Sequence, residues 1–477
     1  MCPVIVAAAF FCLLNNNILI LRSKKSFTMG HKQTKTQLSH PTPKIFKLNT
    51  DCFDEIFEYL DVKDLYSFGR TCKRMNKVAG EYFKQNYSSH RIQCQRDGIY
   101  MFYRGKSGVQ KFIEISRFNK FMTKMGIKID NLDGNDSLKY IKSHINEFES
   151  TKYIQLSWLG IDNKLFEHLR QLLPQLEVVQ NDNCYMNGDI YDLIFKYCKN
   201  LREIHFQNSS VGIRTNGELN WLLQEYPKLQ YFELTPRDSY QIEELRDFFV
   251  RNPNVHRFST SVDFLWDNRD ILLNSKAKLD VLELKRISHT WSPLYKRQTP
   301  ENILELLNRL HEQGFYKRLH IYVDDVDEKI GTSLASFKGL EFLYIRNLVE
   351  IYILAQLTNL RELMIWGGSR DMEILANALI KLERLYIFVS NIDEIMPFIR
   401  RSPKLNKIKF IPLKEGVVLN LTMLNAERAK LIGARKITIY TRDDVFLATK
   451  WTTRNGDTNL SFIEMRRLDS IVWNCTF

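Results

Sequence analysis

The chain has few cysteines for its length, and they lack the spacing of a metal or disulfide site. Its eight cysteines are scattered from Cys2 to Cys475 without a single Cys-x-x-Cys pair. Zinc sites and disulfide frameworks both need regularly spaced cysteines, so we expect neither. Reduced thiols are typical of the cytosol and the nucleus, and we therefore predict a cytoplasmic or nuclear location.

No group of residues has the spacing of a catalytic, metal or phosphate-loop site. The carboxylate pairs at 324–325 and 443–444 are adjacent in sequence, and adjacent residues of a strand point to opposite faces. The ten histidines are dispersed, without a His-x-x-x-His motif. Residues 104–108 contain Gly-Lys-Ser, but Tyr100 stands where a phosphate loop needs its first glycine. We predict a protein that is not an enzyme and needs no cofactor and no metal.

The chain also lacks an uninterrupted apolar run long enough for a clean membrane span. Residues 3–14 are apolar, but asparagines at 15–17 interrupt the run, and no basic residues precede it as in a signal peptide. Three interpretations stay open: a signal, an anchor followed by cytosolic basic residues, or a start of translation at Met29, where the sequence matches a myristoylation pattern. We expect residues 1–44 to be a separate segment, disordered or upstream of the true start, and no membrane as a partner.

Acidic residues are absent from the first 50 positions, and this absence accounts for much of the net charge of +13. Residues 1–50 carry +7, and the remaining +6 is spread over the rest of the chain. A basic tail is typical of a solvated or targeting segment, so we expect no nucleic acid as a partner. Hydrophobic and charged contents of 44% and 26% are typical of a globular protein, but 477 residues exceed one ordinary core unless they form a repeat array.

Residues 46–87 have the pattern of three short amphipathic helices. Apolar residues recur at i, i+3, i+4 and i+7 from Phe53, which is the spacing of one helix face. Asn49, Thr50 and Asp51 offer side-chain oxygens for the N-cap. Further apolar stripes begin at Leu65. So small a domain buries too little apolar surface alone, and we expect another element to cover that face.

This stretch resembles the F-box. Leu48 opens the family's pattern, and Ile56-Phe57, Leu60, Leu65 and Cys72 follow at its spacing, while Asn49 replaces the usual proline and Met75 the frequent tryptophan. The resemblance implies a three-helix domain over residues 45–90 that docks on a Skp-family adaptor, which joins a cullin–RING scaffold; the alternative is an ordinary three-helix cap. The adaptor-binding residues that it implies are Leu48, Phe53, Ile56, Phe57, Leu60, Leu65, Phe68, Cys72 and Met75.

From residue 122 onward one short motif, apolar-x-x-apolar-x-apolar, recurs to the end of the chain. Copies begin at residues 122, 151, 176, 201, 229, 255, 279, near 317, and at 340, 360, 382 and 405, with weaker copies at 434 and 460. Most of these starts are 20–29 residues apart, the range of leucine-rich repeats; one longer step contains an insertion at 291–300. Helical patterns lie between the copies, for example at 242–253, 301–314 and 392–403.

The recurring strand and helix predict a curved solenoid, with parallel strands on the concave face and helices outside. The array resembles the leucine-rich repeats of F-box proteins, including the Pro-x-Leu lead-in at Pro174, Pro227 and Pro403. The predicted fold class is α/β: an N-terminal F-box at 45–90, a connector at 91–121 in which we see no clear period, and a solenoid with a C-terminal cap at 122–477. The alternative is an ordinary α/β domain with leucine-rich strands.

Strand positions that flank the last apolar residue of each motif point away from the core. In early repeats they are polar: His205, Gln207, Glu233, Thr235, Ser259, Ser261, Glu283 and Lys285. In later repeats aromatics and arginine enter, the composition of interface hot spots; lateral packing between strands is the alternative. The predicted substrate-binding residues are Tyr322, Tyr344, Arg346, Trp366, Tyr386 and Phe388.

Together the two resemblances imply the substrate-recognition subunit of a Skp–cullin–F-box ubiquitin ligase. The F-box would bind the adaptor, and the repeats would bind a protein substrate. The alternative is an extracellular or membrane-attached leucine-rich-repeat binding protein, to which glycosylation sequons at six asparagines (86, 135, 208, 420, 459 and 474) point. The absence of cysteine clusters at the ends of the array argues against that alternative.

Overall fold

The computed structural model describes residues 45, 48–87, 90–95, 98–104, 110–128, 134–157, 167–184, 188–207, 219–236, 241–287, 299–325, 328–347, 351–366, 371–389, 391–453 and 460–468. The chain divides into two compact units, Met1–Asp61 and Val62–Phe477. The predicted N-terminal segment 1–44 and most of the insertion at 291–300 lie outside the described residues.

In the first unit the structure describes one α-helix, α2 (Thr50–Phe57). Among the three predicted cap residues, Asn49 is the one that caps it: its side-chain oxygen accepts a hydrogen bond of 2.9 Å from the Cys52 backbone N–H. Acidic Asp51 lies in the first turn, where the helix dipole favours negative charge. The predicted first helix is therefore confirmed.

The second unit begins with two helices that pack on each other, α3 (Val62–Gly69) and α4 (Lys73–Asn86). They rest on a short helix, η2 (Ser116–Phe121), through the buried ring of Phe118, which contacts Tyr66 edge-on with ring centroids 5.2 Å apart. Gly80 allows the close approach of α4, because a Cβ at this position would overlap the Phe121 ring. Within the second unit, the apolar face of α3 and α4 is thus covered by η2, which precedes the first repeat.

Each of the fourteen predicted motif copies forms a strand. The strands are β4 (Lys124–Lys128), β5 (Tyr153–Ser157), β6 (Val178–Asp182), β7 (Glu203–Gln207), β8 (Tyr231–Thr235), β9 (Arg257–Ser261), β10 (Leu279–Ile287), β11 (Tyr316–Asp325), β12 (Leu340–Asn347), β13 (Glu362–Trp366), β14 (Arg384–Val389), β15 (Lys407–Pro412), β16 (Ile437–Thr441) and β17 (Ile463–Arg467). Each pairs in parallel with the next, from β4 to β17.

Three further strands extend the same sheet before β4, in the segment where we saw no period. They are β1 (Ile92–Gln95), β2 (Gly98–Arg104) and β3 (Gln110–Glu114). β1 lies parallel to β4, while β2 is antiparallel to both β1 and β3. The described residues therefore form one 17-stranded sheet with the strand order β3-β2-β1-β4, continuing in sequence to β17.

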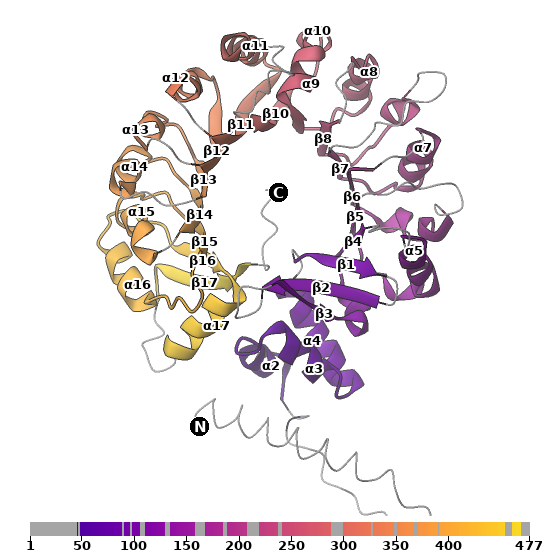
Figure 1. The fold of residues 1–477 in the computed structure, drawn as a ribbon, viewed down its shortest axis with the longest axis vertical. Coiled ribbons are helices and arrows are strands. Elements are labelled where there is room, and N and C mark those ends of the chain that lie inside the picture. The colour runs from indigo at the N-terminus through magenta and orange to yellow at the C-terminus, as the bar shows by residue number, and fades with distance from the viewer. Residues whose placement is uncertain are drawn as a thin grey trace, which may run out of the picture. The chain divides into compact units, whose positions relative to one another are not determined.

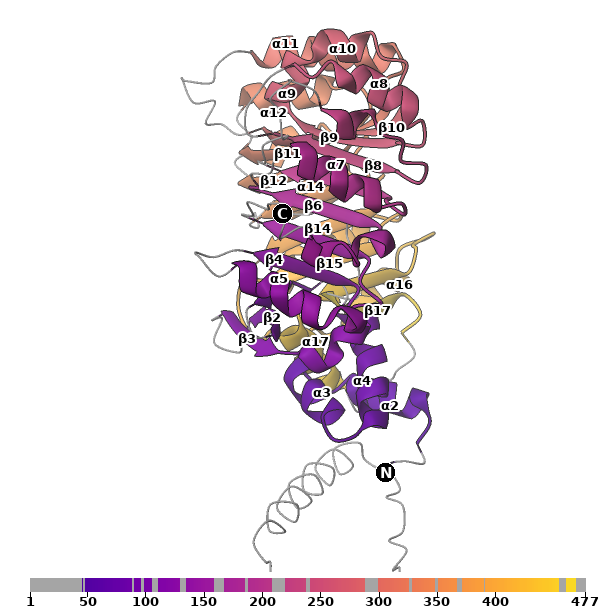
Figure 2. The same cartoon turned by 90° about the vertical axis from the view of Figure 1, so that its right-hand side faces the viewer.

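Helices alternate with the strands and lie on the outer side of the curved sheet, as predicted (Figures 1 and 2). They are α5 (Gly134–Ser143), η3 (Ile145–Glu147), η4 (Leu173–Gln175), α7 (Gly188–Tyr197), η5 (Asn220–Leu223), α8 (Glu244–Arg251), α9 (Val262–Asp267), α10 (Arg269–Leu273), α11 (Pro300–Glu312), α12 (Glu328–Ser336), α13 (Ile351–Leu354), α14 (Met372–Ala378), η6 (Ile392–Glu394), α15 (Met396–Arg401), α16 (Leu421–Ala429) and α17 (Asp443–Thr452). The predicted α/β solenoid, with parallel strands inside and helices outside, is confirmed.

The last repeat returns to the helices at the start of the second unit (Figure 1). Arg467 of β17, which is 2% exposed, donates hydrogen bonds to the Asp443 carboxylate (2.5 Å) and to the Tyr87 hydroxyl (3.0 Å). Tyr87 follows α4 directly and donates its own hydroxyl proton to Asp443 at 2.9 Å. The Tyr87 hydroxyl, at the end of α4, therefore closes the solenoid into a ring through its hydrogen bonds to the Arg467–Asp443 ion pair of the last strand and helix.

Candidate functional site

The predicted adaptor-binding residues near α2 divide into buried and half-buried side chains. Phe53 and Phe57 are fully buried, and their rings stack with centroids 5.8 Å apart. Leu48, Ile56 and Leu60 are half-buried. Because a partner must reach the side chain that it contacts, the three half-buried residues are the direct candidates, while the two rings stabilise the local structure. The adaptor-binding role of all five stays a prediction.

The remaining predicted adaptor residues lie on the α3–α4 pair. Leu65, Phe68 and Met75 are at most 4% exposed, and Cys72, which precedes α4, is half-buried. Three of these four residues therefore belong to the core of the helix pair, so substitutions there would change its folding before its binding.

On the sheet, side chains alternate between the helices and the inner face, as strand geometry requires. In β14, Leu385 and Ile387 are fully buried on the helix side, and Tyr386 and Phe388 take the alternate positions on the inner face. The same alternation places all six predicted substrate-binding residues on the inner face of β11 to β14.

Strand register divides these six residues between two rows. Tyr322 pairs with Tyr344, Tyr344 with Met364, and Met364 with Tyr386 on successive strands. Trp366 pairs with Phe388 in a second row, two positions further along the strands, where Arg346 also lies. The structure therefore brings the predicted residues together, but not in a single line.

The tyrosine row is packed, not open. Tyr322, Tyr344 and Tyr386 are each 7% exposed, and they form one apolar cluster whose other buried members include Phe342 and Ile411. The rings of Tyr322 and Tyr344 lie 5.8 Å apart. Lateral packing, the alternative considered for these rings, thus accounts for much of their burial.

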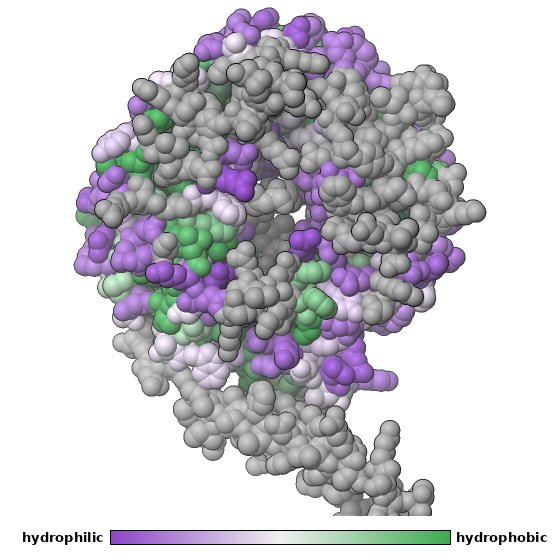
Figure 3. Space-filling view, in the orientation of Figure 1, coloured by the Kyte–Doolittle hydropathy of each residue, from purple (hydrophilic) through white to green (hydrophobic). Residues whose placement is uncertain are grey.

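The second row is open to solvent. Trp366 is 38% exposed and packs on Phe388, with ring centroids 4.1 Å apart. Arg346 is exposed beside them, and Leu413, just beyond β15, is 61% exposed. In Figure 3 hydrophobic side chains gather beside the central opening at the level of β13 to β15. This accessible group of Arg346, Trp366 and Phe388 is named here the aromatic ledge.

The polar half of the inner face holds a buried ion network. His205 hydrogen-bonds the Glu233 carboxylate through Nδ1 (2.8 Å) and the Glu203 carboxylate through Nε2 (3.1 Å). Glu233, fully buried, also accepts from Gln207 at 2.9 Å and pairs with the Lys285 ammonium at 2.9 Å. Every strong charge in this group therefore has a partner of opposite sign.

The pKa values of His205 and Glu233 each shift in the direction opposite to the shift that burial alone would cause. Burial lowers the pKa of His205, but hydrogen bonds to Glu203 and Glu233 outweigh it and raise the pKa above its ordinary value. Burial raises the pKa of Glu233, but the Lys285 ammonium and the His205 imidazole outweigh it and lower the pKa to about 2. An imidazolium between two carboxylates donates a hydrogen bond from each ring nitrogen and has no nitrogen left to accept a proton. The role of this arrangement is therefore structural.

A neighbouring pair continues the network along the sheet. The Arg257 guanidinium donates to the buried Glu283 carboxylate from Nε (2.9 Å) and from Nη2 (2.6 Å). The sequence pattern did not single out Arg257 or Phe342, because each lies two residues before the inner-face positions that flank the last apolar residue of its motif. Residues two positions apart in a strand share a face, so the residue two positions before each counted one also lies on the inner face. This rule identifies both Arg257 and Phe342.

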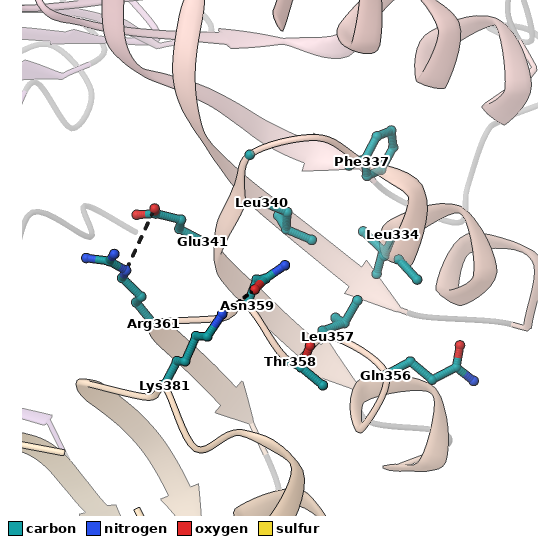
Figure 4. Close-up of a pocket in the computed structure, with 12 residues that line it drawn as sticks. Leu334, Phe337, Leu340, Glu341, Gln356, Leu357, Thr358, Asn359, Arg361 and Lys381 are labelled. Carbon is teal, nitrogen blue, oxygen red and sulfur yellow. Dashed lines mark hydrogen bonds and ion pairs between the residues drawn. The ribbon is translucent and has the colours of Figure 1, made fainter. Parts of the chain in front are cut away.

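A small cleft of about 240 Å³ lies at the N-terminal ends of β12 and β13, between the turns that precede these two strands. Its charged groups are already engaged with one another (Figure 4): Arg361 lies 3.8 Å from the Glu341 carboxylate, and Lys381 donates to Asn359 at 2.7 Å. These contacts join neighbouring repeats and engage the charged groups Arg361, Glu341 and Lys381 that line the cleft.

Within the described residues, no group of histidine, cysteine, aspartate and glutamate side chains could hold a metal ion. In the same part of the chain, no helix combines the length and the apolar character that crossing a bilayer requires. Of the predicted glycosylation sequons, Asn86 lies in α4 and its amide donates to the Tyr82 carbonyl at 3.1 Å, and the Asn420 side chain caps α16. Positions 208, 459 and 474, and the side chain of Asn135, lie outside the described residues.

Comparison with known proteins identifies the N-terminal helices. Residues 45–82 match the F-box domain, so the chain carries an F-box followed by a leucine-rich-repeat solenoid. No curated protein sequence matches the chain.

Similar solved structures include two internalins of Listeria monocytogenes strain 4b F2365. The internalin inlF is 14% identical with a TM-score of 0.23, and the match covers 74% of this chain and 89% of that one. Internalin C2 is 12% identical with a TM-score of 0.21, covering 50% and 83%. Because both TM-scores are low, the repeat architecture rests on the strand pairings of this chain alone.

Proposed function

We propose that this chain is the substrate-recognition subunit of a Skp–cullin–F-box ubiquitin ligase. The observation that carries the proposal is the F-box at residues 45–82, directly followed by a repeat solenoid that offers a separate binding surface. F-box domains typically bind Skp-family adaptors, which join a cullin–RING scaffold. The chain itself catalyses no step; it raises the rate of ubiquitin transfer by holding a substrate near the recruited conjugating enzyme. A cytoplasmic or nuclear location suits this role.

The division of labour follows the predicted domains, F-box at 45–90, connector at 91–121 and solenoid at 122–477. Among the adaptor-binding candidates, Leu48, Ile56 and Leu60 are accessible enough to contact a partner directly. The connector strands join the sheet of the solenoid, which gives the F-box helices α3 and α4 a firm attachment to the receptor.

The protein substrate is proposed to bind at the aromatic ledge. Its exposed tryptophan packs on Phe388 next to an exposed arginine. Tryptophan and arginine are enriched among the residues that carry most of the binding energy in interfaces. Tyr322, Tyr344 and Tyr386 support the ledge from the packed row beside it. The ion network around Glu233 joins β7, β8 and β10 in the other half of the inner face.

The adaptor role is tested by co-expression of the chain with a Skp-family adaptor and purification of the complex. Replacing both Ile56 and Leu60 by Asp places two charges in the proposed interface, and an unpaired buried charge costs about 3–5 kcal/mol. We expect the variant to keep its far-UV circular dichroism and to lose the adaptor. The matched control is Lys139→Asp with Lys142→Asp on the exposed face of α5, which should retain it. A folded Ile56/Leu60 variant that still co-purifies with the adaptor contradicts the proposal.

A further inference from the structure

A second cleft, of about 700 Å³, lies where the α3–α4 pair meets η2 and α5. Its walls come from residues 69–73, which join α3 to α4, from Asn76 of α4, and from η2. Tyr140 of α5, His144 and Glu147 of η3 complete them. None of these residues belongs to the inner face of the solenoid, and only Cys72 is among the predicted adaptor-binding residues. The cleft is therefore a separate feature of the molecule.

Four cations line this cleft without a carboxylate partner. Arg70, Lys73, Arg117 and Lys120 are all exposed, and in the described part of the chain none of them forms an ion pair. Elsewhere on this molecule exposed cations are commonly paired across repeats, as Arg401 is with Glu373 at 2.7 Å. Four unpaired positive charges around one concavity raise the local concentration of anions.

The acidic groups nearby are already engaged. Glu114 accepts hydrogen bonds from the Tyr66 hydroxyl (2.9 Å) and from the Ser116 backbone N–H (2.7 Å). Glu147, the one carboxylate that lines the cleft, accepts from the Asn119 side-chain amide at 2.9 Å. The cations therefore face a cleft whose net charge is positive.

The backbone adds donors to the same cleft. The fourteen-residue helix α4 starts there, and Cys72 at its N-cap makes no side-chain hydrogen bond to the first turn. The first N–H groups of a helix have no intrahelical partner, and together with the helix dipole they favour a bound anion such as phosphate.

A buried asparagine supplies an independent indication that the cleft accepts a hydrogen-bond donor. Asn119 lines the cleft and is 1% exposed, and its Oδ1 has no hydrogen-bond partner although its Nδ2 is bonded to Glu147. Leaving a buried acceptor unpaired destabilises the fold, because the oxygen loses its hydrogen bonds to water without gaining another. A ligand with an N–H or O–H donor next to its anionic group would satisfy this oxygen.

We propose that this cleft binds a phosphate monoester that carries a hydrogen-bond donor next to the phosphate. The cations and the first turn of α4 hold the phosphate, and Asn119 accepts the donor. A phosphoserine side chain with its neighbouring peptide N–H has this chemistry, and so does a free phosphorylated polyol with its hydroxyl groups. The proposal stands independently of the adaptor and substrate roles.

The test is isothermal titration calorimetry on the full chain, with three probes at one ionic strength: a pentapeptide Ala-Gly-phosphoserine-Gly-Ala, glycerol 1-phosphate and inorganic sulfate. We expect saturable binding of at least one phosphate probe. Sulfate, which is an anion without a donor, should bind at least tenfold more weakly. Tighter binding of the peptide identifies a phosphorylated protein as the source, and tighter binding of glycerol 1-phosphate identifies a small molecule.

Two exposed lysines on α5 that do not line the cleft provide the matched control. Arg117→Ala with Lys120→Ala should weaken binding of the phosphate probe at least tenfold. Lys139→Ala with Lys142→Ala should leave the affinity for this probe unchanged. Equal weakening in both variants, equal affinity for sulfate, or no saturable binding overturns the proposal. Loss of the co-purified adaptor in the Arg117/Lys120 variant also overturns it, because the cations would then belong to the adaptor surface.

Discussion

Replacing Trp366 and Tyr386 separately by alanine distinguishes recognition from packing on the inner face. Tyr386 is 7% exposed, its ring lies 5.0 Å from that of Phe388, and the Lys409 ammonium sits 4.5 Å from its centroid. Truncating a large buried aromatic costs about 3–5 kcal/mol, so we expect Tyr386→Ala to lose about 3 kcal/mol of folding stability. Trp366 is 38% exposed and packs chiefly on Phe388, and an aromatic pair contributes about 1 kcal/mol beyond its burial.

The stability difference is measured by thermal unfolding followed by far-UV circular dichroism. Tyr386→Ala should melt well below the wild type, and Trp366→Ala only slightly below it. Recognition is measured by purifying each variant from cells with its bound proteins and quantifying them by mass spectrometry. A hot-spot residue contributes about 2 kcal/mol or more to binding, which corresponds to a loss of about 30-fold in affinity.

Trp451 provides a matched control for this experiment. It is 40% exposed, nearly the same as Trp366, but it lies on α17 on the outer side of the ring. Trp451→Ala should leave the bound proteins unchanged. If Trp366→Ala melts as far below the wild type as Tyr386→Ala, both rings are packing groups. If it is stable and retains the same proteins as Trp451→Ala, the aromatic ledge is not the receptor surface.

Two further substitutions test the physical reasoning about buried charge. Arg428 is fully buried and donates to five backbone carbonyls, including those of Ile399 and Leu405. Arg428→Met should lower the free energy of unfolding, measured in urea, by at least about 3 kcal/mol, because several buried carbonyls lose their donor. A loss below about 1 kcal/mol would contradict this expectation. Glu233→Gln removes a carboxylate whose pKa falls from 4.5 to about 2, worth roughly 3 kcal/mol at 1.36 kcal/mol per unit. A lowered pKa stabilises the fold above the unfolded pKa, and this contribution is lost as the pH falls through the folded pKa. The stability gap between wild type and variant should therefore be full at pH 7, less than half as large at pH 3 and nearly closed at pH 2; a gap that does not depend on pH would refute the assignment.

Local periodicity in the sequence was sufficient to predict most of the architecture. Each motif copy, including the weak ones at 434 and 460, forms a strand because the alternation of apolar residues at a period of two decides which face of a strand is buried. The helical stripe from Phe53 and the cap at Asn49 were predictable for the same reason, since capping and helix periodicity involve residues only three or four positions apart.

Tertiary structure alone decided which inner-face residues are accessible and how the ring closes. The sequence placed Tyr386 and Trp366 on the same face, but exposure depends on lateral neighbours such as Ile411 and Phe388, which come from other repeats. Likewise Arg467 closes the ring on Tyr87, 380 positions earlier in the chain. The period of one strand specifies the direction of its side chains, whereas the distance between side chains on different strands is set by register and by the curvature of the sheet, which no local pattern contains.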